Sequence, residues 1–226
     1  MLIPDLSPVF LSVKLALLTT LILLVTGLPL AYWLARSAGV FALLVEVIVT
    51  MPLVLPPTVL GFYLLVAFNP GHNPAHWLLQ HTGLQLTFSF EGLLAGSVLY
   101  SLPFMITPLK AALQNLPPSL SQASLSLGKS LTRTFVSVLL PAMRPAVVSA
   151  VVISFAHTLG EFGVVLMIGG NIPGKTRLAS MAIYDSVENL DYAAAGFYSL
   201  VLFGLAFLLI TFVFIYNRKP VSTPLW

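Results

Sequence analysis

The octapeptide GGNIPGKT, Gly169 to Thr176, has the residue spacing of a phosphate-binding loop. In the pattern G-x-x-x-x-G-K-T, backbone N–H groups and the lysine surround the phosphates of ATP. That chemistry also needs a parallel sheet around the loop and an acidic residue that holds magnesium. The chain after Thr176 is mostly one apolar run, which leaves no residues for such a sheet. We therefore exclude nucleotide binding here and expect a loop shaped by glycine and proline.

His157 and Glu161 are a second group that could do chemistry, because two ionisable residues stand four apart in an apolar run. On a helix this spacing puts both side chains on one face. Ionisable groups in apolar spans are rare and are functional hypotheses by default. The two residues could relay protons, as in an ion-coupled carrier. They could instead form a structural hydrogen-bonded pair beside Gly160 and Gly163.

Three histidines, His72, His76 and His81, lie in the segment NPGHNPAHWLLQHTG. Histidines four apart on a helix can bind zinc. Pro74 interrupts the helical spacing, and neither a cysteine nor an acidic residue lies nearby to complete a site. We expect a polar loop and no metal site.

The composition shows where these residues must be placed. Hydrophobic residues make up 58% of the 226 residues and charged residues only 8%, whereas a soluble domain has about a quarter charged residues. Most of this protein is therefore surrounded by lipid. The start, MLIPDLSPVF, has no basic residue before the first apolar run, so we expect this run to be retained and not cleaved as a signal peptide.

Five segments have the roughly 20 apolar residues that a membrane-spanning helix needs. The second is over-long and contains Pro52, Pro56 and Pro57, so we expect it to be broken, with the break facing the protein interior. The five predicted spans are Val9–Trp33, Phe41–Phe68, Gly92–Ala112, Ala146–Ile168 and Ala193–Tyr216.

The basic residues predict the orientation, because Lys and Arg concentrate on the cytoplasmic side. With the N-terminus outside and the C-terminus inside, Lys175 and Arg177 lie outside and Lys14 lies near the outer end of the first span. The inner side then holds Arg36, Lys110, Lys129, Arg133, Arg144, Arg218 and Lys219. The outer side holds Asp5, Glu91, Asp185, Glu188 and Asp191.

Small and hydroxyl-bearing residues recur along the spans. Ala142, Ala146, Ala150 and Ser154 form a stripe at steps of four, which suits close helix packing and could also line a narrow pore. An anion path needs hydroxyls and backbone donors in place of fixed strong charges, which would trap the ion. The candidate pore-lining residues are Thr58, Ser101, Thr107 and Ser154.

The segment Ser121–Pro145 is polar and basic, and in the predicted orientation it lies in the cytoplasm. Apolar residues recur at steps of three or four from Leu120 to Val138, which predicts one helical face. Ser119 with Gln122 predicts a capping box, and Gly128 predicts a turn between two short helices. The segment could lie on anionic lipid or dock a cytoplasmic partner.

This segment resembles the cytoplasmic loop of prokaryotic ABC importer permeases, whose pattern is E-A-A, three residues, G, nine residues, I-x-L-P. The chain has Gln122-Ala123-Ser124, then Gly128, then Val138 to Pro141. In that family the loop forms a coupling helix that inserts into a groove of the ATPase subunit. Because Gln122 and Ser124 depart from the pattern, one contact is weakened or replaced. The resemblance assigns this coupling role to Ser119, Gln122, Ala123, Ser124, Gly128, Leu140 and Pro141.

Two further stretches, Met51–Leu65 and Leu159–Asp185, are similar to molybdate-type permeases, and sulfate permeases share a related GEFG…GNIP region. The resemblance implies an all-α membrane fold of the molybdate/sulfate/methionine type, with about five transmembrane helices in one domain over residues 1–226. Residues 117–141 would form the cytoplasmic coupling loop. Residues at the outer mouth, where a binding protein would dock, are Asn171, Pro173, Gly174, Lys175 and Arg177.

The resemblance implies a non-enzymatic subunit of an ATP-driven importer in the inner (cell) membrane of a prokaryote, with molybdate or tungstate as cargo. Its partners would be a second copy of the chain, two ATP-binding subunits, a molybdate-binding protein and membrane lipid, but no nucleic acid. ATP and magnesium would bind the partner, with no cofactor or metal on this chain. For an anionic cargo, the structural pair of His157 and Glu161 is favoured, because a bare carboxylate repels anions. A sulfate permease, an ion-coupled carrier and a non-transporting scaffold remain alternatives.

Overall fold

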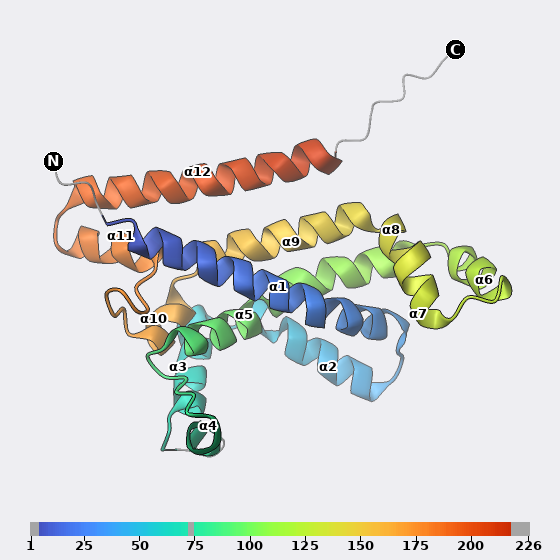
Figure 1. Cartoon of the computed structure of the whole chain (residues 1–226), viewed down its shortest axis with the longest axis horizontal. Coiled ribbons are helices and arrows are strands. Elements are labelled where there is room, and N and C mark those ends of the chain that lie inside the picture. Colours follow the sequence, from blue (N-terminus) through green and yellow to red (C-terminus); the bar gives the residue numbers. More distant parts are fainter. Residues whose placement is uncertain (1–4, 72–74, 218–226) are drawn as a thin grey trace, which may run out of the picture.

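Helices form all of the secondary structure in the described part of the chain, residues 5–71 and 75–217 (Figure 1). The structure, a computed structural model, thus confirms the all-α prediction. His72, Arg218 and Lys219, on which predictions were made, lie outside the described residues. Three helices are long and apolar enough to cross a membrane as single rods: α1 (Ser7–Arg36), α5 (Phe90–Asn115) and α12 (Tyr192–Asn217).

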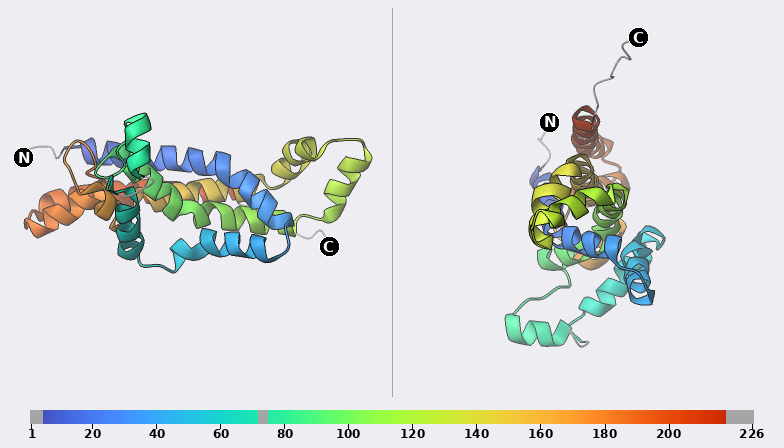
Figure 2. Two further views of the ribbon diagram at one scale, coloured as in Figure 1. Left: turned by 90° about the horizontal axis from the view of Figure 1, so that it is seen from below. Right: turned by 90° about the vertical axis from the view of Figure 1, so that its right-hand side faces the viewer.

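The second predicted span is sharply bent at its prolines. The first half turns by 114° where the second half begins, so the second half runs across the long axis of the molecule (Figure 2). Pro56 and Pro57 have no N–H, so the carbonyls of Pro52 and Leu53, four residues earlier, have no helical donor. The elements of this span are α2 (Val40–Thr50), the short helix η1 (Met51–Leu53) and α3 (Pro57–Phe68), followed by α4 (Ala75–Thr82).

The break in this span lies on the surface of the chain. Val54 is 85% exposed, and Pro56, Pro57 and Thr58 are exposed as well. The prediction that the break faces the interior is therefore wrong for the single chain. The reason is that α10 (Gly163–Gly169) and α5 pack against α3, while several of its other residues are exposed.

The fourth predicted span, Ala146–Ile168, is not one continuous helix. Helix α9 (Arg144–Leu159) stops before Gly160, and α10 starts a new helix at Gly163. Gly160 caps the end of α9, and Gly163 lets α10 approach α3, because a Cβ added there would lie 2.8 Å from Pro57 Cβ. Before α9 the chain is bent by 79° and passes through α6 (Pro118–Ser126), α7 (Leu131–Thr134), the π-helix η2 (Phe135–Leu139) and α8 (Leu140–Ala142).

Helices α1, α5 and α9 lie side by side and enclose the larger hydrophobic core. A smaller core lies towards α10 and α11 (Ala179–Glu188). The buried residues of the larger core include Leu23, Leu34, Met105, Ile106, Leu109, Met143 and Ala150, and those of the smaller one Leu15, Leu93, Val165, Leu178 and Met181.

Helix α12 lies outside this core, along α9 (Figure 1). Of its residues only Ala195 and Tyr198 are buried, which suits a helix whose other sides face lipid. Hydrogen bonds tie both of its ends to the body. Tyr198 Oη donates to the carbonyl of Asp5 at 2.7 Å, and Asn217 Nδ2 donates to Ser149 Oγ at 2.6 Å.

Candidate functional site

The loop between α10 and α11 has the letters of a phosphate-binding loop but not its geometry. The N–H groups of Lys175, Thr176 and Arg177 all donate to one carbonyl, that of Ile172, at 3.1, 2.9 and 3.0 Å. The hydroxyl of Thr176 donates to the carbonyl of Gly169 at 2.7 Å and accepts from Ile172 N–H at 2.9 Å. These backbone N–H groups and the Thr176 hydroxyl are thus used within the loop, whereas the Lys175 side chain is exposed.

The five residues predicted at the mouth divide into two groups. Asn171 and Arg177 turn inward: Asn171 Nδ2 donates to both carboxylate oxygens of Asp185 at 2.8 Å, and Arg177 forms an ion pair with the same carboxylate. Pro173, Gly174 and Lys175 are exposed at the tip. Asp185 therefore acts as the anchor of this loop, and the tip is left to make other contacts.

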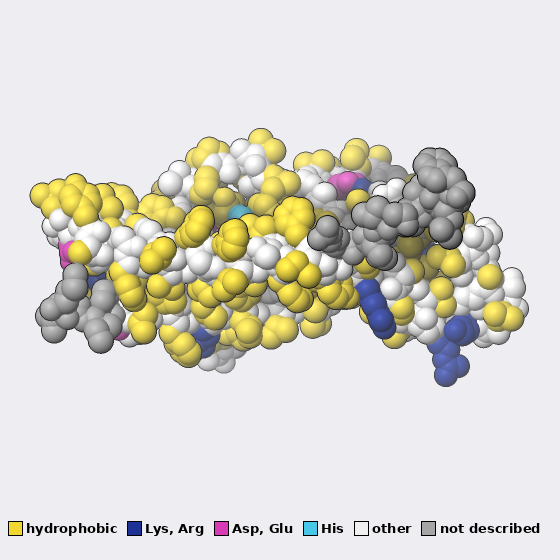
Figure 3. Space-filling model, turned by 90° about the horizontal axis from the view of Figure 1, so that it is seen from above, with side chains coloured by type: hydrophobic (Ala, Val, Ile, Leu, Met, Phe, Trp, Pro, Cys, Tyr) yellow, Lys and Arg dark blue, Asp and Glu magenta, His cyan; other side chains and the backbone are white. Residues whose placement is uncertain are grey.

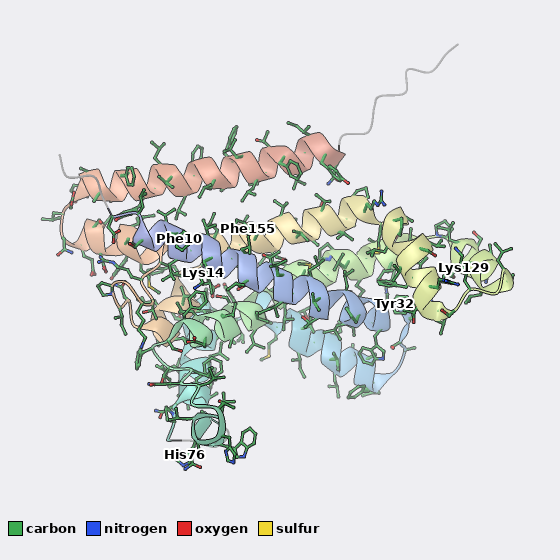
Figure 4. The ribbon with its side chains drawn as sticks, in the orientation of Figure 1. Phe10, Lys14, Tyr32, His76, Lys129 and Phe155 are labelled. Carbon is green, nitrogen blue, oxygen red and sulfur yellow. The ribbon has the colours of Figure 1, made fainter. Side chains whose placement is uncertain are left out.

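A cavity of about 470 Å³ lies beside this loop, at the start of α1. Lys14 and Arg177 bring positive charge to it, while Phe10 supplies an apolar wall. Figure 4 shows Phe10 and Lys14 on the first turns of α1. Asp5 lies at its edge and accepts hydrogen bonds from the hydroxyl and the N–H of Ser7, which lower the pKa of the Asp5 carboxyl.

His157 and Glu161 do not form the predicted pair, because the helix ends between them. Each bonds instead to a serine of α5: Ser97 Oγ donates to Glu161 Oε2 at 2.8 Å, and Ser101 Oγ lies 3.0 Å from His157 Nδ1. The imidazole lies between the rings of Tyr100 and Phe104. The two residues thus fasten the end of α9 to α5 separately.

The chain of hydroxyls around His157 determines which ring nitrogen carries the proton. Thr158 Oγ1 donates to the carbonyl of Ser154 at 3.0 Å, so Ser101 Oγ, 3.0 Å from Thr158 Oγ1, must be the donor between the two hydroxyls. The proton of Ser101 is then used, and His157 Nδ1 must donate to Ser101 Oγ. The neutral imidazole therefore presents Nε2 as an acceptor, which cannot donate a hydrogen bond to an anion.

Glu161 lies within the break and is only 4% exposed. Ser180 Oγ donates to the Glu161 carbonyl at 2.6 Å, so a backbone group that the break frees is bonded again. Sequence reasoning missed Ser97 and Ser180, because serines in apolar spans carry no local sign of their partners.

The four candidate pore hydroxyls differ in their exposure. Thr58, at the start of α3, and Thr107, on α5, are exposed on the single chain. Ser101 and Ser154 are fully buried, so they do not line an open path in this conformation. In the stripe of small residues to which Ser154 belongs, Ala150 lies in the core, Ala146 is half-buried and Ala142 is exposed.

An ion pair between α2 and α5 also escaped the sequence analysis. Lys110 Nζ donates to Glu46 Oε1, and both side chains remain partly exposed. Lys110 was assigned only to the positive side of the membrane, and Glu46 lies inside an apolar run where no local pattern indicated a partner. The pair joins the first half of the bent span to α5.

The segment with the coupling pattern forms the far end of the molecule (Figures 1 and 2). Gly128, at φ +79°, makes the predicted turn between α6 and α7. The predicted capping box is wrong, because α6 begins with Pro118 in its first turn and has no side-chain cap, which places Ser119 inside the helix. Basic side chains appear at this end in Figure 3.

Several apolar side chains of this segment point away from the protein. Leu127 is 81% exposed, and Leu131 and Val136 are also exposed, as are Gln122, Ala123 and Pro141. The π-helix that follows is closed by a bond from Leu140 N–H to the Phe135 carbonyl. Pro141 cannot donate, which favours this wider turn directly before it.

Residues 27–219 match the family described as "Binding-protein-dependent transport system inner membrane component". The chain belongs to this family. Members of such a family are membrane components of transport systems, in agreement with the apolar helices and with the prediction of a non-enzymatic, multi-pass inner-membrane subunit.

Two curated relatives place the chain within the family. The molybdenum transport system permease protein ModB of Azotobacter vinelandii is 48% identical over 192 residues, which cover 84% of each chain. The sulfate transport system permease protein CysT of Escherichia coli (strain K12) is 31% identical over 186 residues, which cover 82% of this chain and 67% of the relative.

A solved structure confirms the predicted type of fold. The MetNI methionine ABC transporter in an inward-facing conformation contains a chain that matches with a TM-score of 0.68, at 17% sequence identity. The match covers 93% of this chain and 95% of the other.

Proposed function

We propose that this chain is the membrane-spanning subunit of an ATP-driven importer that carries molybdate or tungstate into the cytoplasm. The identity of 48% with a molybdenum transport permease, over 84% of both chains, carries the proposal. Sulfate is the second candidate cargo, because a sulfate permease is 31% identical. The whole chain acts as one permease domain, with residues 117–141 as its coupling loop.

The energy for transport comes from a partner that binds ATP and magnesium. The exposed apolar side chains of Leu127, Leu131 and Val136 form a surface that suits a protein partner. We assign this surface to an ATP-binding subunit. The loop at 169–176 supports the assignment of ATP to a partner, because several of its backbone N–H groups and the Thr176 hydroxyl are already used within the loop.

The N-terminus lies outside the cell and the C-terminus in the cytoplasm. In this orientation the α6–α7 end, with Lys129, Arg133 and Arg144, is cytoplasmic, in accordance with the distribution of basic residues in membrane proteins. The exposed loop tip at Pro173–Lys175 then faces the binding protein that delivers the anion.

Two copies of the chain form the transporter. Of the two carbonyls that Pro56 and Pro57 leave without helical donors, that of Leu53 belongs to an exposed residue, and such a group is not stable against lipid. A second copy of the chain would cover the break between α2 and α3, or would form with it a water-filled cavity. The path of the anion then runs between the copies, past the hydroxyls of Thr58 and Thr107. His157 has a structural role, because its neutral imidazole offers only the acceptor Nε2 and cannot donate a hydrogen bond to the anion.

Uptake of radiolabelled molybdate tests the cargo. Cells with and without the gene are supplied with submicromolar molybdate and with excess tungstate or sulfate as competitor. We expect gene-dependent uptake that tungstate blocks and sulfate does not, because tungstate matches molybdate in charge and shape. Uptake blocked by sulfate alone would transfer the assignment to the second candidate, and the absence of gene-dependent uptake would contradict both.

A further inference from the structure

A buried hydrogen bond joins the two helices on either side of the Gly128 turn. Ser124 Oγ, on α6, lies 2.9 Å from Thr134 Oγ1, on α7. Ser124 is 5% exposed and Thr134 is 2% exposed, in a segment whose other polar side chains are mostly at the surface. The serine stands where the coupling pattern has alanine, so this bond depends on a departure from that pattern.

The first turn of α6 is not packed firmly on the body of the protein. A cavity of about 380 Å³ lies there, lined by Arg36 at the end of α1, Gln114 at the end of α5, and Ser121 of α6 itself. Helix α6 packs instead against α7 and η2. The position of α6 is therefore determined mainly at its far end, where Ser124 lies.

The residue that follows Thr134 connects this end to α1. The ring of Phe135 packs edge-on against the ring of Tyr32, with centroids 4.8 Å apart. The guanidinium of Arg36 lies 4.6 Å from the centroid of the same Tyr32 ring. Figure 4 shows Tyr32 at the end of α1 beside this segment. Through η2 and α8 the chain then continues into α9.

We propose that the Ser124–Thr134 hydrogen bond is a positioning contact that makes α6, α7 and η2 move as one rigid body. A displacement of α6 by a bound ATPase then reaches α1 through Phe135 and α9 through α8. The inference rests on the proposed function, since it requires a partner that moves α6. Without the bond, α6 would move into its cavity without displacing α1 and α9. ATP would then be hydrolysed with little transport.

The test uses the whole transporter with its ATPase in proteoliposomes and measures molybdate transported per ATP hydrolysed. Because S124A, T134V and the double variant remove the same bond, each should lower this ratio by about fivefold, the lower end of typical coupling between sites, with no further loss in the double variant. T134S keeps the hydroxyl and should keep the ratio. T26V, at an exposed position of α1 outside the coupling loop, should remain within about twofold.

Thermal unfolding of the same variants separates positioning from simple stability. S124A and T134V each leave a buried hydroxyl unpaired and should lower the stability, whereas the double variant removes both hydroxyls and should recover part of it. A transport ratio that recovers together with stability in the double variant would overturn the proposal, as would an unchanged ratio in S124A. If the wild-type transporter shows no ATP-driven uptake, the proposed function fails and the inference fails with it.

Discussion

The break between α9 and α10 is enclosed by the protein's own side chains, whereas the break between α2 and α3 is open. At the enclosed break, Glu161 is buried, its carboxylate accepts from Ser97, and its carbonyl accepts from Ser180. At the open break, Val54 is 85% exposed, and Pro56 and Pro57 provide no N–H. The first break is buried within one chain, although Glu161 Oε1 has no partner there among the described residues, and the second is a surface that another molecule can cover.

This difference suggests that the two helix breaks have different roles, although both are marked by Gly or Pro in the sequence. An enclosed break fixes the path of the backbone, because the Glu161 carbonyl and one of its carboxylate oxygens have donors inside the fold. An open break keeps backbone groups available for a second copy, for water or for a passing anion. The two breaks also touch, since a Cβ added to Gly163 would lie 2.8 Å from Pro57 Cβ.

Gly163→Ala should have the largest effect on stability, because it forces the two breaks apart. We expect the free energy of unfolding to fall by about 2 to 3 kcal/mol, as for other overpacked sites. The measurement is denaturant titration of the purified chain in micelles. Gly204→Ala is the matched control, because a Cβ there has nothing within 4 Å; it should be neutral or slightly stabilising. Equal effects of the two variants would contradict the close approach.

Ser180→Ala should have the next largest effect, and it weakens only the enclosed break. Removing the hydroxyl leaves the Glu161 carbonyl without its donor, which costs about 1 to 2 kcal/mol. Ser186→Ala, on the same helix, should be within about 0.5 kcal/mol of the wild type in the same titration. No loss in Ser180→Ala would mean that the enclosed break does not depend on this bond.

Pro57→Ala should have the smallest effect on stability but should impair transport, since it alters the open break. The exposed alanine restores an N–H for the Leu53 carbonyl and lets the helix straighten. We expect less than about 1 kcal/mol of change in unfolding and a fall in molybdate uptake of about tenfold, equivalent to about 1.4 kcal/mol. Pro145→Ala, an exposed proline in the first turn of α9, is the control. Unimpaired uptake in Pro57→Ala would remove the functional meaning of the open break.

The sequence predicted the features that depend on composition and on local pattern. Apolar length located α1, α5 and α12, the prolines predicted the broken second span, and Gly128 predicted a turn. Each of these follows from a property of neighbouring residues, such as a missing N–H or an allowed positive φ. The coupling pattern was also visible, because its residues are close together in the chain.

Contacts between distant segments were not predictable in this way. The four-residue spacing of His157 and Glu161 indicated a pair, but the helix ends at Leu159 and each side chain bonds to a different serine of α5. In the sequence Ser124 is a departure from the coupling pattern, and only the fold places Thr134 beside it. Such partners are decided by how helices pack, and spacing along one segment contains no record of it.

The sequence by itself thus determined that the chain is a helical membrane protein with an ordered polar segment, because lipid accepts few charges and a helix bonds its own backbone. Only the tertiary structure decided which interruptions are closed and which are open. A freed carbonyl or a buried carboxylate is stable only when a donor reaches it, and here those donors come from residues far away in the sequence, Ser97 and Ser180.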